Sequence, residues 1–190
     1  WAHLENAGGS YVPDQVISLL QDFFITSKVQ PYWDFGPSAK AGEAMDRSLE
    51  LIPSTFNADR DEVHFGPSTS QNTYVLAQAL RPSWNIGDEI IVTNQDHEAN
   101  IGAWRRLEMT GINVIEWGVD PETGLLDISE VRNLINDRTR LLAVTHASNL
   151  AATINPISEL AELIHDVGGI LVTDGVSYAP HAAIDVKDLD

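Results

Sequence analysis

Cysteine is absent from this chain of 190 residues, so it forms no disulfide, binds no zinc through thiolates and offers no cysteine nucleophile. Basic residues are also scarce. Eleven lysines and arginines stand against 28 aspartates and glutamates, for a formal net charge of −17. Such a chain repels nucleic-acid phosphates and anionic membrane surfaces, and neither is expected as a partner. We interpret the excess of acids as a solvated surface that favours solubility.

Long apolar runs and targeting signals are missing as well. No apolar segment approaches the roughly 20 residues that span a bilayer. The first five residues have neither the basic start nor the apolar middle of a signal peptide. A cytoplasmic location is therefore expected. Because the chain opens on Trp1 and stops at Asp190 without a closing element, we also expect it to be a segment of a longer protein.

Three glycine-rich signatures are absent too. No G-x-S-x-G occurs, which disfavours an α/β-hydrolase. Residues 66–71 contain neither the Gly-Lys-Ser nor the Gly-Lys-Thr of a Walker loop. The G-x-G-x-x-G fingerprint of dinucleotide-binding domains is missing.

What the sequence does contain is an alternation of helical segments and short apolar runs. Helices are expected at residues 13–27, 38–52, 70–81, 97–110, 129–136 and 156–168, and strands at 63–65, 89–93, 113–117, 140–146 and 170–173. Most of these strands are continuously apolar, which is typical of a parallel sheet covered on both faces. The predicted fold class is therefore α/β. Residues 1–55 are expected to form a helical arm and residues 56–190 a sheet domain.

The most informative segment is residues 169–181. The apolar run Ile170–Val172 leads to Asp174, and Gly175 follows at once, as expected for a buried strand. A carboxylate at the carboxyl end of such a strand lies where open α/β sheets bind ligands. Because an unpaired buried charge is costly, Asp174 is expected to have a cationic partner.

Polar residues follow other predicted strands in the same way. Ser68–Gln71 stand between a strand and a helix, where hydroxyls and backbone N–H groups suit a phosphate, although Ser and Thr also cap helices routinely. His97 opens a helix, and Asn149 follows the strand at 140–146. Because the carboxyl ends of parallel strands meet at one edge, these residues and Asp174 are expected to share one site.

No metal site is expected. Adjacent helical residues point in different directions, so Asp96, His97 and Glu98 do not converge on one ion. His181 and Asp185 have a spacing that suits metal ligation, but a structural loop is the favoured interpretation.

Four segments form a specific combination. They are Leu4–Ala7, Ser68–Gln71, Asp96–Asn100 with Trp104, and residues 145–190, which include Thr-His-Ala-Ser-Asn and Thr-Asp-Gly-Val-Ser-Tyr-Ala-Pro-His. Together they resemble the class V aminotransferases, and most of all the cysteine desulfurase and selenocysteine lyase branch. The first three segments lie where that family has Leu-Asp-Asn-Ala, Gly-Thr-Thr-Glu and a His-x-x-Asn helix start. The resemblance covers most of the chain.

The resemblance implies the three-layer αβα large domain of a pyridoxal 5′-phosphate enzyme. It implies that Asp174 pairs with the pyridine nitrogen and keeps it protonated, which makes the ring an electron sink. His97 would stack on the ring, and both residues would be catalytic. Thr69 and Ser70 would hold the phosphate. Asn149 would reach the ring hydroxyl or the substrate carboxylate.

The chain departs from the family at three places. Ser177, an expected cofactor contact, stands where the family usually has Gln, and Ala152 stands where it has Gly. The family's Schiff-base lysine lies in a Ser-x-His-Lys motif, and Lys28, Lys40 and Lys187 are all outside such a motif. Without that amine the coenzyme has no covalent attachment. We therefore expect a fragment that is inactive by itself, truncated before the lysine and the small C-terminal domain.

The expected substrate is an amino acid, a small molecule, and the intact protein is expected to be a homodimer. The reaction stays open among sulfur removal from cysteine, transamination, racemisation and β-elimination. Two alternatives also stay open. One is a doubly wound nucleotide-binding module in which Asp174 binds a ribose hydroxyl, and the other is a non-catalytic fragment.

Overall fold

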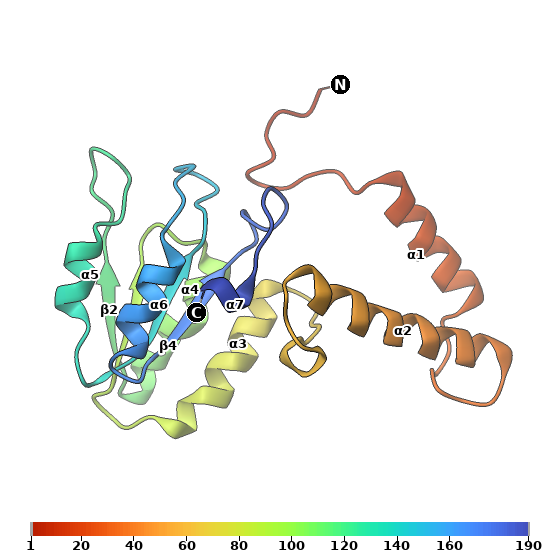
Figure 1. The fold of residues 1–190 in the computed structure, drawn as a ribbon, viewed down its shortest axis with the longest axis horizontal. Coiled ribbons are helices and arrows are strands. Elements are labelled where there is room, and N and C mark those ends of the chain that lie inside the picture. The colour runs from red at the N-terminus through yellow and green to blue at the C-terminus, as the bar shows by residue number, and fades with distance from the viewer. Residues whose placement is uncertain (1, 190) are drawn as a thin grey trace. The chain divides into compact units, whose positions relative to one another are not determined.

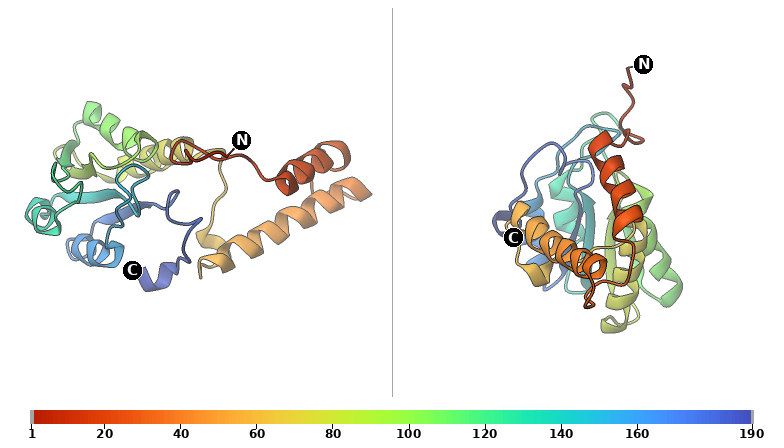
Figure 2. Two further views of the ribbon diagram at one scale, coloured as in Figure 1. Left: turned by 90° about the horizontal axis from the view of Figure 1, so that it is seen from above. Right: turned by 90° about the vertical axis from the view of Figure 1, so that its right-hand side faces the viewer.

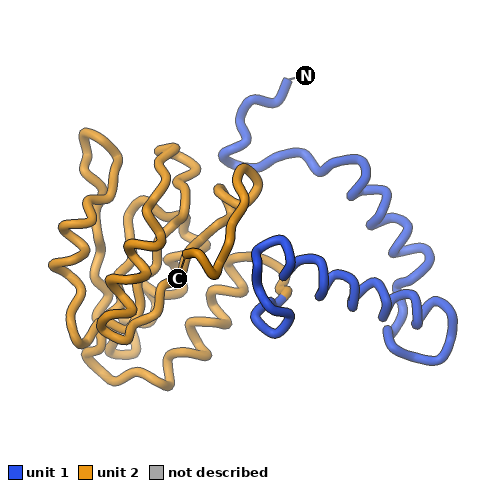
Figure 3. Tube along the Cα trace, viewed as in Figure 1, with its two compact units in different colours: residues 1–64 blue, residues 65–190 orange. Residues whose placement is uncertain are grey.

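A computed structural model describes residues 2–189. The chain divides between His64 and Phe65 into two compact units, drawn in blue and orange in Figure 3. The first unit contains helices α1 (Asp14–Thr26) and α2 (Gly36–Thr55) and a short 3-10 helix, Arg60–Glu62. No residue of α1 is buried. The arm over residues 1–55 and the sheet domain over 56–190 stay predictions as domain boundaries. No helix within the described range is long and apolar enough to cross a membrane.

The second unit is built on one sheet of four parallel strands in the order β2-β1-β3-β4 (Figure 1). The strands are β1 (Glu89–Thr93), β2 (Asn113–Trp117), β3 (Thr139–Thr145) and β4 (Ile170–Asp174). All three neighbouring pairs are parallel, as the continuous apolar runs predict. Their carboxyl ends therefore lie along one edge of the sheet.

Helices cover both faces of this sheet, which confirms the three-layer αβα architecture (Figure 2). One face carries α3 (Thr69–Leu80), α4 (Glu98–Arg105) and the 3-10 helix Arg106–Thr110. The other carries α5 (Ile128–Leu134) and α6 (Ile157–His165). Successive strand residues point to opposite faces. Ile90 accordingly packs on the face covered by α3 and α4, and Ile91 packs on the face covered by α5 and α6.

Two details of the predicted elements are wrong. Val63–Phe65 form no strand, because their backbone finds no partner in the sheet. Helix α2 continues past Pro53 to Thr55, although proline lacks an N–H for the helical ladder. The hydroxyls of Ser54 and Thr55 donate to carbonyls of the preceding turn at 2.7 Å, so this last turn has other hydrogen bonds. A short helix α7 (Val186–Leu189) was not predicted.

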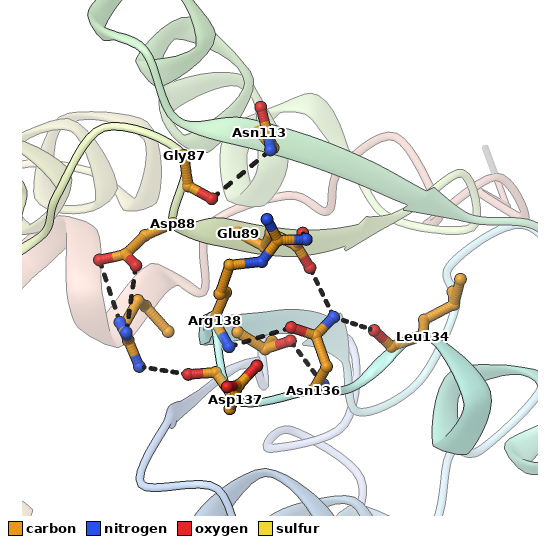
Figure 4. A network of polar contacts seen from close by, with 10 residues as sticks. Gly87, Asp88, Glu89, Asn113, Leu134, Asn136, Asp137 and Arg138 are labelled. Carbon is orange, nitrogen blue, oxygen red and sulfur yellow. Dashed lines mark hydrogen bonds and ion pairs between the residues drawn. The ribbon is translucent and has the colours of Figure 1, made fainter.

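Ion pairs close the opposite edge of the sheet, where the strands begin (Figure 4). Glu89, with a side chain 6% exposed, pairs with Arg138 at 2.8 Å and accepts a hydrogen bond from Asn136 Nδ2 at 2.7 Å. Asp88 accepts two bonds from Arg140, at 3.0 Å from Nε and 3.1 Å from Nη2. These contacts tie the start of β1 to that of β3.

Candidate functional site

The carboxyl edge of the sheet gathers the polar residues singled out in the sequence. Thr145, the last residue of β3, lies beside Asp174, the last residue of β4. Just beyond them the His146 amide donates to the Asp174 carbonyl at 2.9 Å. Parallel pairing thus brings the segments that follow β3 and β4 side by side, as predicted.

Asp174 is half-buried and keeps its carboxylate at the edge. Its Oδ1 accepts a hydrogen bond from the Val176 amide at 2.9 Å, so the turn after β4 fixes the side chain. Among residues 2–189 no lysine, arginine or histidine forms an ion pair with it. The cationic partner that the sequence predicts for Asp174 is therefore not supplied by the described part of the chain.

His97 is the N-cap residue of α4 and its side chain is exposed. Its Nδ1 accepts a hydrogen bond from the Ala99 amide at 3.0 Å. A neutral imidazole that accepts at Nδ1 carries its hydrogen on Nε2. The ring therefore presents a donor at its outer nitrogen.

Asp96, directly before His97, is a half-buried carboxylate that was not among the predicted site residues. Its Oδ1 accepts from Asn100 Nδ2 at 2.6 Å, and its other oxygen accepts a hydrogen bond from the Thr93 hydroxyl. Burial raises the pKa of Asp96, and the negative charge of Asp174 acts in the same direction. The two carboxylates therefore lie at the same edge.

The loop after β3 is built around Ser148. The buried Ser148 hydroxyl accepts from the Leu150 amide at 3.3 Å and the Ala151 amide at 3.1 Å, and its carbonyl accepts from the Ala152 amide at 3.1 Å. Asn149 is half-buried within this loop. Ala152 has φ of 55°, in the left-handed region that favours glycine.

An aromatic stack that the sequence analysis missed joins the segments after β3 and β4. The rings of His146 and Tyr178 lie 3.6 Å apart between centroids, with an interplanar angle of 15°. Burial lowers the pKa of His146, which favours the neutral ring. Tyr178 and Ala179 both donate backbone bonds to the Gly175 carbonyl, and the half-buried Ser177 lies within this turn.

Thr69 and Ser70 are the first two residues of α3, and both are exposed. The Ser68 hydroxyl caps the helix by accepting from the Gln71 amide at 3.2 Å. Because α3 leads into the start of β1, its own start points to the opposite, carboxyl edge (Figure 1). A Cβ on Gly66 would lie 1.6 Å from Asn72 Oδ1, so a larger residue there would displace the Asn72 side chain.

Together these groups suit a ligand that has both an anionic and a cationic part. The free N–H groups and hydroxyls at the start of α3 suit an anion. The Asp174 carboxylate suits a cation, and His97 offers an aromatic face. The structure gives no direct contact among Thr69, His97 and Asp174, so their joint action stays a prediction.

Comparisons with known proteins identify relatives of the whole chain. The family model for aminotransferase class-V matches residues 2–190. The aminotransferase-like protein FGM3 of Gibberella zeae is 38% identical over 97% of this chain and 47% of its own length. A cysteine desulfurase of Haloferax volcanii is 32% identical over 99% of this chain and 45% of its own length.

A solved structure agrees with these sequence matches. The cysteine desulfurase CsdA of Escherichia coli superposes with a TM-score of 0.85 and 26% identity, over 98% of this chain and 48% of that chain. The chain thus spans about half the length of the relatives it matches.

Proposed function

The chain belongs to the class V aminotransferase family, and from that membership we propose that it is the cofactor-binding part of a pyridoxal 5′-phosphate enzyme acting on an amino acid. The observation that carries the proposal is Asp174, a half-buried carboxylate at the carboxyl end of a central-sheet strand with no cation paired to it within residues 2–189. A protonated pyridine ring would provide that cation.

The residues at this edge fit the coenzyme. Asp174 would hold a proton on the pyridine nitrogen, because an adjacent carboxylate favours the charged ring. When bound, the coenzyme supplies the electron sink for negative charge at the substrate α-carbon. His97 would pack its ring against the coenzyme, with the hydrogen on Nε2 directed away from its own helix. Thr69 and Ser70, at the start of α3, would bind the phosphate.

Two further residues would complete the contacts. Asn149, in the loop after β3, would bind the ring hydroxyl or the substrate carboxylate. Ser177 would occupy the place of the family's glutamine with a shorter side chain. Among the open reactions, sulfur removal from cysteine is supported by the names of the desulfurase relatives. The proposal includes a homodimeric, cytoplasmic protein whose Schiff-base lysine lies outside residues 1–190, so that this segment alone is inactive.

The test is coenzyme binding by this chain and by Asp174→Asn. Asparagine keeps the oxygen that accepts from the Val176 amide but removes the charge. At a ligand concentration of 100 Kd, binding stabilises the native state by about 2.7 kcal/mol. In a chain of this size that raises the melting temperature by roughly 5–10 °C. We expect pyridoxal 5′-phosphate to give this shift in the unsubstituted chain and little or none in Asp174→Asn.

Asp166→Asn is the matched control, since Asp166 is an exposed residue at the end of α6 and the substitution removes the same charge. It should bind like the unsubstituted chain. Protection by NAD instead of pyridoxal phosphate would support the nucleotide-binding alternative. Equal protection of Asp174→Asn and Asp166→Asn would show that the carboxylate does not face the ring. In the full-length protein, Asp174→Ala should abolish turnover while the fold stays intact.

A further inference from the structure

We propose that Asp96 is a positioning residue of this site, which holds His97 in its orientation by fixing the corner between β1 and α4. The inference rests on the function proposed above, in which His97 faces the coenzyme. Asp96 itself would touch neither coenzyme nor substrate.

Both carboxylate oxygens of Asp96 are engaged within the corner. One accepts from Asn100 Nδ2 at 2.6 Å, and the other accepts from the Thr93 hydroxyl. Thr93 and Asn100 are 0% and 2% exposed, so both donors come from the packed interior. The Asp96 amide also donates back to the Thr93 hydroxyl at 3.2 Å. Asp96 thus connects the last residue of β1 to the first turn of α4.

His97 depends on that same turn of helix. Its Nδ1 accepts from the Ala99 amide at 3.0 Å, and its carbonyl accepts from the Asn100 amide at 2.9 Å. Ala99 and Asn100 therefore set both the ring and the backbone of His97. Because Asn100 is bound to Asp96, loss of the Asp96 carboxylate would loosen the turn that orients the ring.

The cost of keeping this carboxylate argues against a merely incidental residue. Burial and the charge of Asp174 both disfavour its ionised form. Hydrogen bonds from Thr93, Asn100 and the Thr145 backbone oppose that effect. Within the described residues no lysine or arginine forms an ion pair with Asp96. The carboxylate is therefore kept at this edge against a desolvation cost. A cationic ligand at this edge would gain from it.

The first measurement concerns the ring of His97 in the absence of any ligand. Nitrogen-15 spectra of the imidazole report its tautomer, and the His97→Gln variant assigns the signals. We expect a single tautomer with hydrogen on Nε2 in the unsubstituted chain and in the control Asp166→Asn. In Asp96→Ala we expect a mixture of both tautomers. Asp96→Asn, which keeps an acceptor oxygen, should recover most of the single-tautomer signal.

The second measurement is the affinity for pyridoxamine 5′-phosphate, which needs no lysine for binding. We expect Asp96→Ala to weaken binding by about fivefold, which is the typical effect of losing one hydrogen bond. Asp96→Asn should weaken it less, and Asp166→Asn should not weaken it. Thermal unfolding without ligand checks that each variant is folded.

The outcomes separate this inference from the proposed function. A folded Asp96→Ala that keeps a single His97 tautomer and full affinity overturns the positioning role. If Asp96→Ala does not fold, Asn100→Ala decides, because it removes the donor that binds Asp96 Oδ1. A folded Asn100→Ala with a single His97 tautomer and full affinity overturns the role. If no variant binds the coenzyme but the tautomer changes in Asp96→Ala, the proposed function fails and the positioning of His97 stands.

Discussion

Replacing Ala152 by glycine tests the backbone of the loop after β3. Ala152 has φ of 55°, where the Cβ of an L-residue crowds the following carbonyl at a cost of roughly 1–2 kcal/mol. The Ala152 amide donates to the Ser148 carbonyl at 3.1 Å. The loop therefore cannot relax φ without weakening that bond. Glycine removes the crowding and leaves the bond in place.

The expected gain follows from two opposing effects. Removing the crowding contributes about 1–2 kcal/mol, while the greater freedom of glycine in the unfolded chain takes back about 0.4–1 kcal/mol. Ala152 is exposed, so its methyl group contributes little burial. We expect Ala152→Gly to stabilise the chain by about 0.5–1 kcal/mol, or roughly 1–4 °C in melting temperature.

Urea and thermal unfolding of the 190-residue chain measure this change. Ala151→Gly is the control, because Ala151 is exposed in the same loop and has no positive φ. It should destabilise the chain by about 0.4–1 kcal/mol. The two substitutions should thus act in opposite directions. If both destabilise the chain, Ala152 is not strained and the left-handed conformation is wrong.

Three further substitutions test other parts of the sheet unit. Arg140→Ala removes both hydrogen bonds to the buried Asp88 and should cost about 2 kcal/mol in urea unfolding; an unchanged midpoint would contradict this. The hydrogen bond from Arg140 lowers the pKa of Asp88 in the folded chain. The ionised Asp88 therefore stabilises the fold fully above the ordinary aspartate pKa of about 3.9, and this stabilisation is lost as the pH falls through the pKa of the folded chain. The unfolding free energy of Asp88→Asn should therefore fall less steeply in acid. Burial lowers the pKa of His146, so the stabilisation by its neutral ring is present above about pH 6.5 and is lost as the pH falls through the folded pKa. His146→Phe, which keeps a ring against Tyr178, should lack that decline, and a decline as steep as in the parent chain would refute the assignment.

The strands of the sheet were predictable because burial on both faces leaves a continuous apolar run. Ile90, Val92 and Leu142 are each 0% exposed. Residues Val63–Phe65 do not form a continuous apolar run of this kind. A strand exists only when a partner accepts its backbone bonds, and three residues cannot reveal whether a partner is near. The end of α2 was placed too early because proline usually ends a helix. Here the helix continues past Pro53, and the hydroxyls of Ser54 and Thr55 donate hydrogen bonds to carbonyls of the preceding turn.

The candidate site was predictable in position but not in its contacts. Asp174, His97 and Asn149 follow directly from topology, because each comes just after a strand end or at the helix start beyond it. The anchoring of Asp96 and the stack of His146 on Tyr178 depend on how side chains from different elements meet. The spacing of residues along the sequence does not predict which side chains of such distant segments are in contact. The best available signal for Asp96 was its place three residues after Thr93 and four before Asn100, within reach of both.

The carboxylates at the two edges of the sheet differ in whether they are paired with a cation. At the edge where the strands begin, Asp88 and Glu89 are each paired with an arginine. At the edge where they end, Asp96 and Asp174 have hydrogen-bond donors but no paired cation within residues 2–189. Carboxylates that only close the fold gain from a guanidinium, as the first edge shows. An arginine at the second edge would neutralise Asp174 and occupy the place of a ligand cation. The contrast therefore supports the proposal that ion pairs stabilise one edge of the sheet and that a cationic ligand binds at the other.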